Sequence, residues 1–268
     1  MGRGWAALVM SASLLACGGT VRRPGPDPVP SGSGGATTLV SLTFDDALAQ
    51  QLAAAAILER HGMRGTFFLN TWRLRSGSAD NMTPAQAKDL EDRGHEIGGH
   101  TIDHVHLTTL TPAQQHVQIC NDRAYLTSVG LDVQSFAYPF GEWNAQARQA
   151  VVDCGYDSAR DISGVDGSVA AESFVPEDPF VLRAPRSIAS TDTVADIEGW
   201  VMRAERQGGW LILTFHHVCD RCAENAIRAE DLENLVAWLE QRRSTGTRTA
   251  RVRDVIGGTT KPVVTWPQ

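Results

Sequence analysis

The chain has 268 residues, of which 42% are hydrophobic and 21% charged, so it is long enough to bury a substantial core. Its formal net charge of -7 argues against a nucleic-acid partner, because proteins that bind nucleic acids carry a stripe of basic residues. A neutral or cationic partner suits this acidic chain better.

The first residues have the composition of an export signal. Arg3 precedes a mostly apolar stretch, 5–15, that is too short to span a bilayer and is typical of a secretory signal peptide. It ends in Leu14-Leu15-Ala16-Cys17-Gly18, which resembles the bacterial lipobox, where cleavage leaves a lipid-carrying cysteine. An ordinary signal peptide with a chance cysteine is the alternative. The sequence therefore predicts a signal peptide over 1–16 and an exported lipoprotein, anchored to a bacterial membrane only through lipid on Cys17, in the periplasm or at the cell surface.

Residues 17–37 are rich in Gly, Pro and Ser and predict a flexible linker, because this composition buries too little apolar surface to fold. No second linker and no internal repeat interrupts 38–268. We therefore expect one catalytic domain there, and we expect the protein to be a monomer.

In chain order, β-rich apolar runs alternate with segments of helical composition. The expected strands are 38–44, 65–70, 95–98, 135–138, 156–160, 180–183 and 210–215, and the expected helices are 48–60, 84–93, 112–130, 144–153 and 232–242. This alternation predicts an α/β fold, a single distorted (β/α) barrel of about seven strands. In such barrels the reactive groups lie at the C-terminal ends of the strands.

Two adjacent carboxylates, Asp45 and Asp46, directly follow the first expected strand. Such a pair often only caps the helix that follows it. Neighbouring residues on a regular strand point to opposite faces, so both carboxylates can serve one site only where the strand breaks into a loop. Their position at the strand end permits this.

Histidines follow two other expected strands. His100 and His104 are four residues apart after the third strand, and His216 and His217 end the last one. Strand alternation directs one of this last pair to the barrel mouth without deciding which. Together with the carboxylates, these histidines suit a hydrolase that holds one divalent metal with an acid and a base beside it.

Four cysteines remain in the body of the chain, an even number that suits disulfides in an oxidising compartment. We expect Cys219 to pair with Cys222, and Cys120 with Cys154, although connectivity cannot be read from the sequence. A second zinc site from Cys219, Cys222 and His217 is the alternative.

These segments, in this order and spacing, resemble the polysaccharide deacetylase (NodB-homology) family, carbohydrate esterase family four. The resemblance runs from about Leu39 to Val218 and on to the end of the barrel near Val255. The segments that match the family's motifs are Thr43–Asp46, Gly94–His104, Phe136–Gly141 (a variant form) and Leu211–His216. The second of these is the most specific.

The resemblance implies a NodB-type barrel and a role for each site residue. The implied ligands of one Zn²⁺, or another divalent metal such as Co²⁺, are Asp46, His100 and His104. Asp45 would be the general base and His216 the general acid. The groups implied to bind the oxyanion or the substrate are the backbone N–H of Phe140, Tyr138 and Arg186.

The sequence departs from the family pattern at two places. Many members carry an arginine, which pairs with the catalytic aspartate, where Ala137 stands here. Arg186 is a candidate to reach the site from another strand instead. The family's Asp-x-Trp motif, which tunes the catalytic histidine, is not evident, and Asp161 is a candidate to replace it.

The resemblance implies a metal-dependent hydrolase that acts on carbon–nitrogen bonds other than peptide bonds. It would remove acetyl groups from cell-envelope or extracellular polysaccharide that contains N-acetylglucosamine. The same centre could cleave O-acetyl esters, as on acetylated xylan. A non-catalytic carbohydrate-binding envelope protein is the alternative of another class.

Overall fold

The structure, a computed structural model, describes residues 1–2 and 38–267. The predicted lipid attachment at Cys17, and nearly all of the predicted signal peptide and linker, lie outside the described residues. Among the residues that are described, no helix is both long and apolar enough to cross a membrane.

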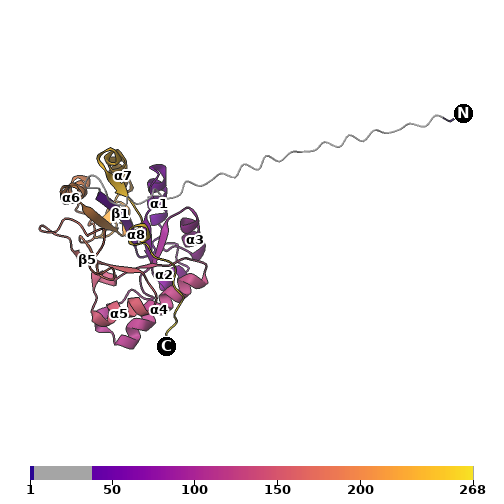
Figure 1. Cartoon of the computed structure of the whole chain (residues 1–268). Helices are drawn as coiled ribbons and strands as arrows, with labels where there is room; N and C mark the ends of the chain where they lie inside the picture. Colours follow the sequence, from indigo (N-terminus) through magenta and orange to yellow (C-terminus); the bar gives the residue numbers. More distant parts are fainter. Residues whose placement is uncertain (3–37, 268) are drawn as a thin grey trace.

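A curled parallel sheet forms the centre of the molecule (Figure 1). Its main strands, in chain order, are Thr38–Asp45 (β1), Thr66–Leu69 (β2), Glu96–Gly99 (β3), Ser135–Ala137 (β4), Ser158–Gly164 (β5), Leu182–Ala184 (β6) and Gly209–Phe215 (β7). They lie in the spatial order β6-β5-β4-β3-β2-β1-β7. No ladder of paired residues joins β6 to β7 in the described part of the chain, so the curl stays an open half-barrel. The prediction of a distorted α/β barrel of about seven strands is confirmed.

One more strand, β10 (Thr247–Thr249), shares an edge of β1 with β2. It pairs with residues 38–40 of β1, whereas β2 pairs with residues 43–45. Strand β7 occupies the other edge along residues 38–44. All eight residues of β1 are buried, as expected for a strand that has neighbours on both edges and cover on both faces.

Helices surround this sheet (Figure 1). Their bounds are Gln51–Arg60 (α1), Thr71–Arg75 (α2), Pro84–Asp92 (α3), Pro112–Ser128 (α4), Ala145–Asp153 (α5), Val194–Gln207 (α6), Ala229–Arg242 (α7) and Val252–Ile256 (α8). Helices α3 and α4 begin where the sequence predicts, because Thr83 and Thr111 each form a capping box ahead of a proline in the first turn. The sequence analysis did not predict helices α2, α6 and α8, strand β10, or a small two-stranded sheet of His217–Val218 (β8) with Ala226–Ile227 (β9).

The aromatic side chains of the core bring three strands together. Phe44 on β1 stacks on Phe67 of β2 and on Phe215 of β7, with ring centroids 4.9 and 5.2 Å apart. All three rings are fully or almost fully buried. Offset stacking of this kind adds to the apolar burial that fixes the strand ends, and those ends carry the polar residues described below.

Two disulfides join the cysteines in the expected pairs. Cys120 of α4 is bonded to Cys154, the residue that directly follows α5, and both are buried. Cys219 is bonded to Cys222 within the loop between β8 and β9.

Candidate active site

The C-terminal ends of β1, β3 and β7 bring together the carboxylates and histidines singled out in the sequence. Asp45 is the last residue of β1. The chain then leaves the strand, because Asp46 has a φ of 84°. This break allows two adjacent carboxylates to serve one site. Asp45 Oδ2 lies 4.0 Å from the Nε2 atoms of both His100 and His216.

Backbone strain is concentrated around this site. In the described part of the chain six residues other than glycine have a positive φ, and five of them lie here; these five are Asp46, Ala47, Thr101, His104 and Phe140. The left-handed region costs a residue with a Cβ atom about 1 kcal/mol or more, so it persists only where the surroundings impose it. Such strain is typical of functional sites.

Asp46, His100 and His104 form a three-ligand cluster. Their ligand atoms all lie within 4.8 Å of one another. Asp46 Oδ1 is 3.4 Å from Nε2 of His104 and 3.8 Å from Nε2 of His100. Two of these atoms, Asp46 Oδ1 and His100 Nε2, are buried and have no hydrogen-bond partner among the described residues. Because a buried polar atom without a partner is costly, both atoms fit a cation.

The hydrogen bonds of His100 prepare it as a metal ligand. Its Nδ1 donates to the backbone carbonyl of Ala137 at 2.7 Å, which leaves the lone pair on Nε2 facing the cluster. Burial lowers the pKa of His100 to about 4 and also lowers the pKa of His104, so both rings are neutral near pH 7. One aspartate and two neutral histidines form a donor set that suits zinc and leaves coordination positions open.

Residues that the sequence analysis did not identify hold His100 in place. Asp122 of α4 is fully buried and accepts from the backbone N–H of His100 and from both donors of Thr71, its N–H and its hydroxyl. Burial raises the pKa of Asp122 to about 7. The Asn70 side chain donates to the carbonyl of His100. Nothing in the local sequence marks these residues, because the contacts join segments far apart in the chain.

Asp45 is paired with an arginine, but not with the expected one. The guanidinium of Arg160 on β5 contacts both carboxylate oxygens of Asp45 at 2.6 Å, and both side chains are buried. The prediction that Arg186 reaches this site is wrong, because Arg186 is exposed and pairs with Asp192. Arg160 is the register partner of Ala137 on the neighbouring strand. It therefore supplies a guanidinium beside the position where the family arginine is missing.

Arg160 decides the charge of Asp45. Burial alone would raise the pKa of this carboxyl, but the guanidinium of Arg160, with smaller contributions from His100 and His216, lowers the pKa below its usual value. Asp45 is therefore ionised near neutral pH.

The structure separates the two adjacent histidines after β7. His216 lies beside Asp45, and its buried Nδ1 has no hydrogen-bond partner in the described residues. His217 points elsewhere, and its Nδ1 is 2.9 Å from the side-chain nitrogen of Gln50. Gln51 donates to the carbonyls of both Asp45 and His216, and so joins the ends of β1 and β7.

Two residues of the segment after β4, Phe140 and Tyr138, have different surroundings. Phe140 is half-exposed, and its ring packs edge-on against His104 and stacks on His106. Tyr138 is buried, and its hydroxyl donates to the carbonyl of Phe180 at 3.0 Å. This corrects the expectation that Tyr138 contacts the substrate, because its ring packs inward against Phe136.

Asp161 makes no hydrogen bond with His216. Its carboxylate accepts from the indole N–H of Trp143 at 3.3 Å and from Ser163. Burial raises the pKa of Asp161. The structure therefore gives no support to Asp161 as the group that tunes His216.

Comparison with known proteins finds one family over part of the chain. A family model described as polysaccharide deacetylase matches residues 34–159. A peptidoglycan-N-acetylglucosamine deacetylase, PgdA, of Listeria monocytogenes is 27% identical over 42% of this chain and 23% of its own length. A chitin deacetylase of a Pestalotiopsis species is 32% identical over 43% of this chain and 39% of its own length. The chain thus spans less than half the length of these curated relatives.

Solved structures agree on the fold. A family 4 carbohydrate esterase from Streptomyces lividans, solved with acetate, has a TM-score of 0.54 and 19% identity over 79% of this chain and 91% of its own. At this identity the likeness shows the fold alone. The family model, the relatives and the shared fold together support a polysaccharide deacetylase domain in this chain.

Proposed function

We propose, on the premise of a polysaccharide deacetylase domain, that the protein is a metal-dependent hydrolase that removes acetyl groups from N-acetylglucosamine-containing polysaccharide. One observation carries the proposal. Asp46 and His100 present unpartnered buried ligand atoms beside a second carboxylate, Asp45, that is held ionised by its own arginine. No helix cap and no hydrogen bond within the described residues accounts for these two atoms.

Asp46, His100 and His104 would hold the metal, whether Zn²⁺ or another divalent ion such as Co²⁺. When bound, it supplies Lewis acidity toward the acetyl carbonyl and toward water. Asp45, the general base, accepts a proton from the water that attacks the acetyl group. It can do so because Arg160 keeps it ionised.

His216 is the general acid that donates a proton to the leaving amine. Its Nε2 lies 4.0 Å from Asp45 Oδ2, so the acid and the base border the same space. The backbone N–H of Phe140 stabilises the oxyanion, since Phe140 packs beside His104 at the rim of the cluster. The two adjacent carboxylates thus have different roles: Asp45 accepts a proton from water, and Asp46 is a metal ligand.

The setting of the enzyme follows from its proposed substrate. Cell-envelope or extracellular glycans lie outside the cytoplasm, and the predicted signal peptide would deliver the protein there. Lipid on Cys17 would hold it on the membrane, and the predicted linker would let a monomeric domain reach the glycan. The glycan would be its one macromolecular partner.

Acetate release tests the proposal. Metal-loaded protein is incubated with N-acetylglucosamine oligomers and with acetylated xylan, before and after treatment with a chelator. We expect release from the oligomers that is lost with chelator and restored by Zn²⁺ or Co²⁺. An Asp45→Asn variant should keep its metal and lose activity. Release that survives chelation would exclude the metal mechanism, release from xylan alone would make the enzyme an O-acetyl esterase, and oligomer binding without release would indicate a carbohydrate-binding protein.

A further inference from the structure

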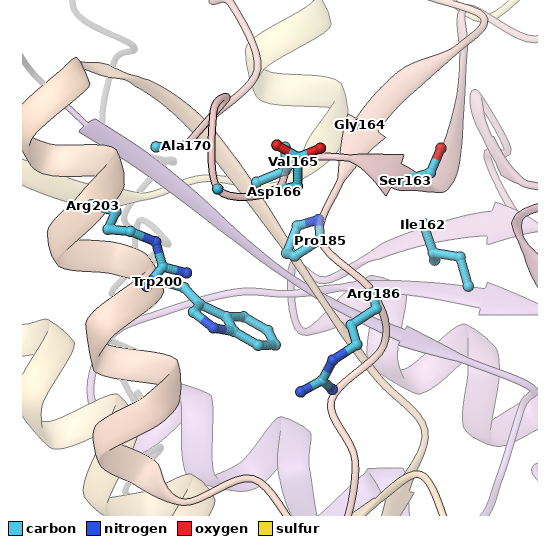
Figure 2. A pocket seen from close by; sticks show the side chains of 11 residues that line it. Ile162, Ser163, Gly164, Val165, Asp166, Ala170, Pro185, Arg186, Trp200 and Arg203 are labelled. Carbon is cyan, nitrogen blue, oxygen red and sulfur yellow. The ribbon is translucent and has the colours of Figure 1, made fainter.

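A hollow of about 480 Å³ opens at the C-terminal end of β5 (Figure 2). The C-terminal end of β5 and the segment after β6 form one part of its wall, with Ile162 and Arg186, and helix α6 forms another, with Trp200 and Arg203. Ligand-binding pockets typically enclose about 300 to 1,000 Å³. The hollow is therefore large enough for a small ligand or one unit of a larger one.

The walls of this hollow are continuous with the candidate site. Ile162 is two residues beyond Arg160 on β5, about 7 Å further along the strand. Its side chain packs so closely on Gly141 that a Cβ atom there would lie 2.3 Å from Ile162 Cγ1. Gly141 directly follows Phe140, the proposed oxyanion donor.

The opposite wall is also connected to the site. Two residues after Arg186, the N–H of Ile188 donates to the carbonyl of Thr214 on β7, which lies two residues before His216. Both walls of the hollow are thus connected to segments that carry groups of the candidate site, Phe140 on one side and His216 on the other.

The hollow contains an unpaired positive charge. No carboxylate lies within 4.0 Å of the Arg203 guanidinium among the residues that the structure describes, and Arg203 is exposed. Arg186 is different, because its guanidinium pairs with Asp192 and lies over the indole of Trp200, 5.2 Å from the ring centroid. Arg206 and Arg248 are also exposed and have no carboxylate within 4.0 Å in the described part of the chain, so what distinguishes Arg203 is its place on the wall of the hollow.

One carboxylate also borders the hollow. Asp166 uses Oδ1 to accept from both the N–H and the hydroxyl of Ser168, each at 2.9 Å. It pairs with neither arginine. The groups offered to a ligand are the part of the Trp200 indole that Arg186 leaves uncovered, the free guanidinium of Arg203 and the carboxylate of Asp166.

We propose that this hollow binds a carboxylate-bearing sugar residue of the glycan, next to the N-acetylglucosamine unit that is deacetylated. The inference rests on the proposed function for the placement of that unit. Arg203 binds the sugar carboxylate through charge-assisted hydrogen bonds, and Trp200 packs against the ring. The substrate is accordingly an acidic glycan, and a neutral chitin-like polymer binds less tightly.

Calorimetric titration of the metal-loaded full chain tests this assignment. One ligand is peptidoglycan strands freed of peptide, whose muramic acid units carry carboxylates. A second is a polymer of alternating N-acetylglucosamine and glucuronic acid, which identifies the source of the carboxylate. The control is the first ligand with its carboxyls converted to amides. We expect one of the acidic ligands to bind about five- to tenfold more tightly than the amide form, the size of one typical hydrogen bond at a solvent-exposed site, and the difference to shrink with added salt.

Two variants locate the effect. Arg203→Gln should remove the preference for the acidic ligand, and Arg206→Gln, an exposed arginine on α6 outside the hollow, should retain it. Trp200→Phe, which keeps an aromatic ring in the fold, should weaken binding of the acidic and amide forms alike. Equal losses in Arg203→Gln and Arg206→Gln, or no preference for either acidic ligand in the unmodified protein, would overturn the assignment.

Acetate release separates this proposal from the proposed function. Selective binding of an acidic glycan, lost in Arg203→Gln, but with no acetate released from any ligand would keep the subsite and remove the deacetylase. Chelator-sensitive release with no effect of carboxylates on binding would keep the deacetylase and remove the subsite.

Discussion

Two clusters in this molecule each bring three potential metal ligands within 4.8 Å of one another, yet their surroundings differ. The first consists of Asp46, His100 and His104, and the second of His217, Cys219 and Cys222. The first is buried or half-buried and contains two ligand atoms without any hydrogen-bond partner in the described residues. The second lies at the surface.

The second cluster has already used its ligand atoms. Cys219 and Cys222 are bonded to each other, so neither can offer a thiolate, and Nδ1 of His217 is 2.9 Å from the side-chain nitrogen of Gln50. The structure therefore favours the disulfide over the second zinc site for these cysteines. Proximity of ligand types is not sufficient; a metal site also needs buried lone pairs that nothing else occupies.

The largest effect should come from the first cluster. His104→Ala removes one of three ligands, and we expect the metal content of dialysed protein, measured by mass spectrometry, to fall to near zero. Acetate release should fall about a thousandfold, the equivalent of the several kcal/mol that a bound metal contributes. His217→Ala is the matched control and should retain both metal and activity. Metal loss in His217→Ala, with metal retained in His104→Ala, would reverse the comparison.

A second large effect should come from the arginine that charges Asp45. Arg160→Met leaves a buried carboxylate unpaired, which should lower the free energy of unfolding by about 3 to 5 kcal/mol. It should also raise the pKa of Asp45. Because the base works only when ionised, the loss of activity at low pH should then begin at a higher pH than in the unmodified enzyme. Denaturant unfolding and a pH–rate profile measure the two effects.

Arg228→Gln is a control for this experiment. Arg228 forms an exposed ion pair with Asp231, and pairs of this kind contribute at most about 1 kcal/mol. The pH–rate profile of the Arg228→Gln variant should match that of the unmodified enzyme. An unshifted profile in Arg160→Met would show that Arg160 does not set the charge of Asp45.

The residues of the candidate site differ in whether the sequence could predict them. Asp46, His100 and His104 lie within two short motifs at strand ends, and the resemblance of these motifs to those of a known family was what named them as ligands. Arg160 could not be found in this way. It reaches Asp45 because β4 and β5 pair in a register that sets Ala137 beside Arg160, and no local pattern specifies that register.

The fold, like the candidate site, was predicted only in part. The buried strands are apolar runs and were located within a few residues, but helix α6 was missed. Only Ile197, Val201 and Ala204 of its 14 residues are buried. Yet apolar residues recur at helical spacing along it, at Val194, Ile197 and Val201, and Thr193 caps its start, so the sequence carried a signal for this helix that the prediction overlooked.

A third and smaller effect is the pH dependence of stability that the buried His95 should cause. His95 is buried, accepts from the N–H of Gly65 and contacts Glu59, and burial lowers its pKa to about 4. In the unfolded chain the pKa returns to about 6.5. Below pH 6.5 the unfolded state therefore gains a proton that the folded state does not. Stability should fall by about 3 kcal/mol between pH 6.5 and pH 4 from this residue.

Unfolding curves at several pH values measure this dependence. His95→Gln keeps the hydrogen bonds but removes the titration, so its stability should vary less over this range. His61→Gln is the contrasting control, because hydrogen bonds to Glu240 and Glu233 at the surface raise the pKa of His61. That contribution has the opposite sign: it is present at low pH and is lost as pH rises. A pH dependence that is unchanged in His95→Gln would contradict a neutral buried histidine.

The smallest effect should come from the surface disulfide. Cys219 and Cys222 are three residues apart, so their bond closes a short loop and should stabilise the fold by about 2 kcal/mol or less on the chain-entropy model. Cys120 and Cys154 are 34 residues apart and buried, and their bond should contribute about 4 kcal/mol. We expect a Cys219→Ser, Cys222→Ser double variant to unfold at slightly lower denaturant and to keep one metal per chain. The corresponding Cys120→Ser, Cys154→Ser variant should lose at least twice as much stability.

Cobalt binding to the reduced protein tests whether the surface cluster can hold a metal once its sulfurs are freed. A second equivalent of cobalt with a thiolate charge-transfer band would show that it can, provided that the Cys219→Ser, Cys222→Ser variant lacks both the second equivalent and the band.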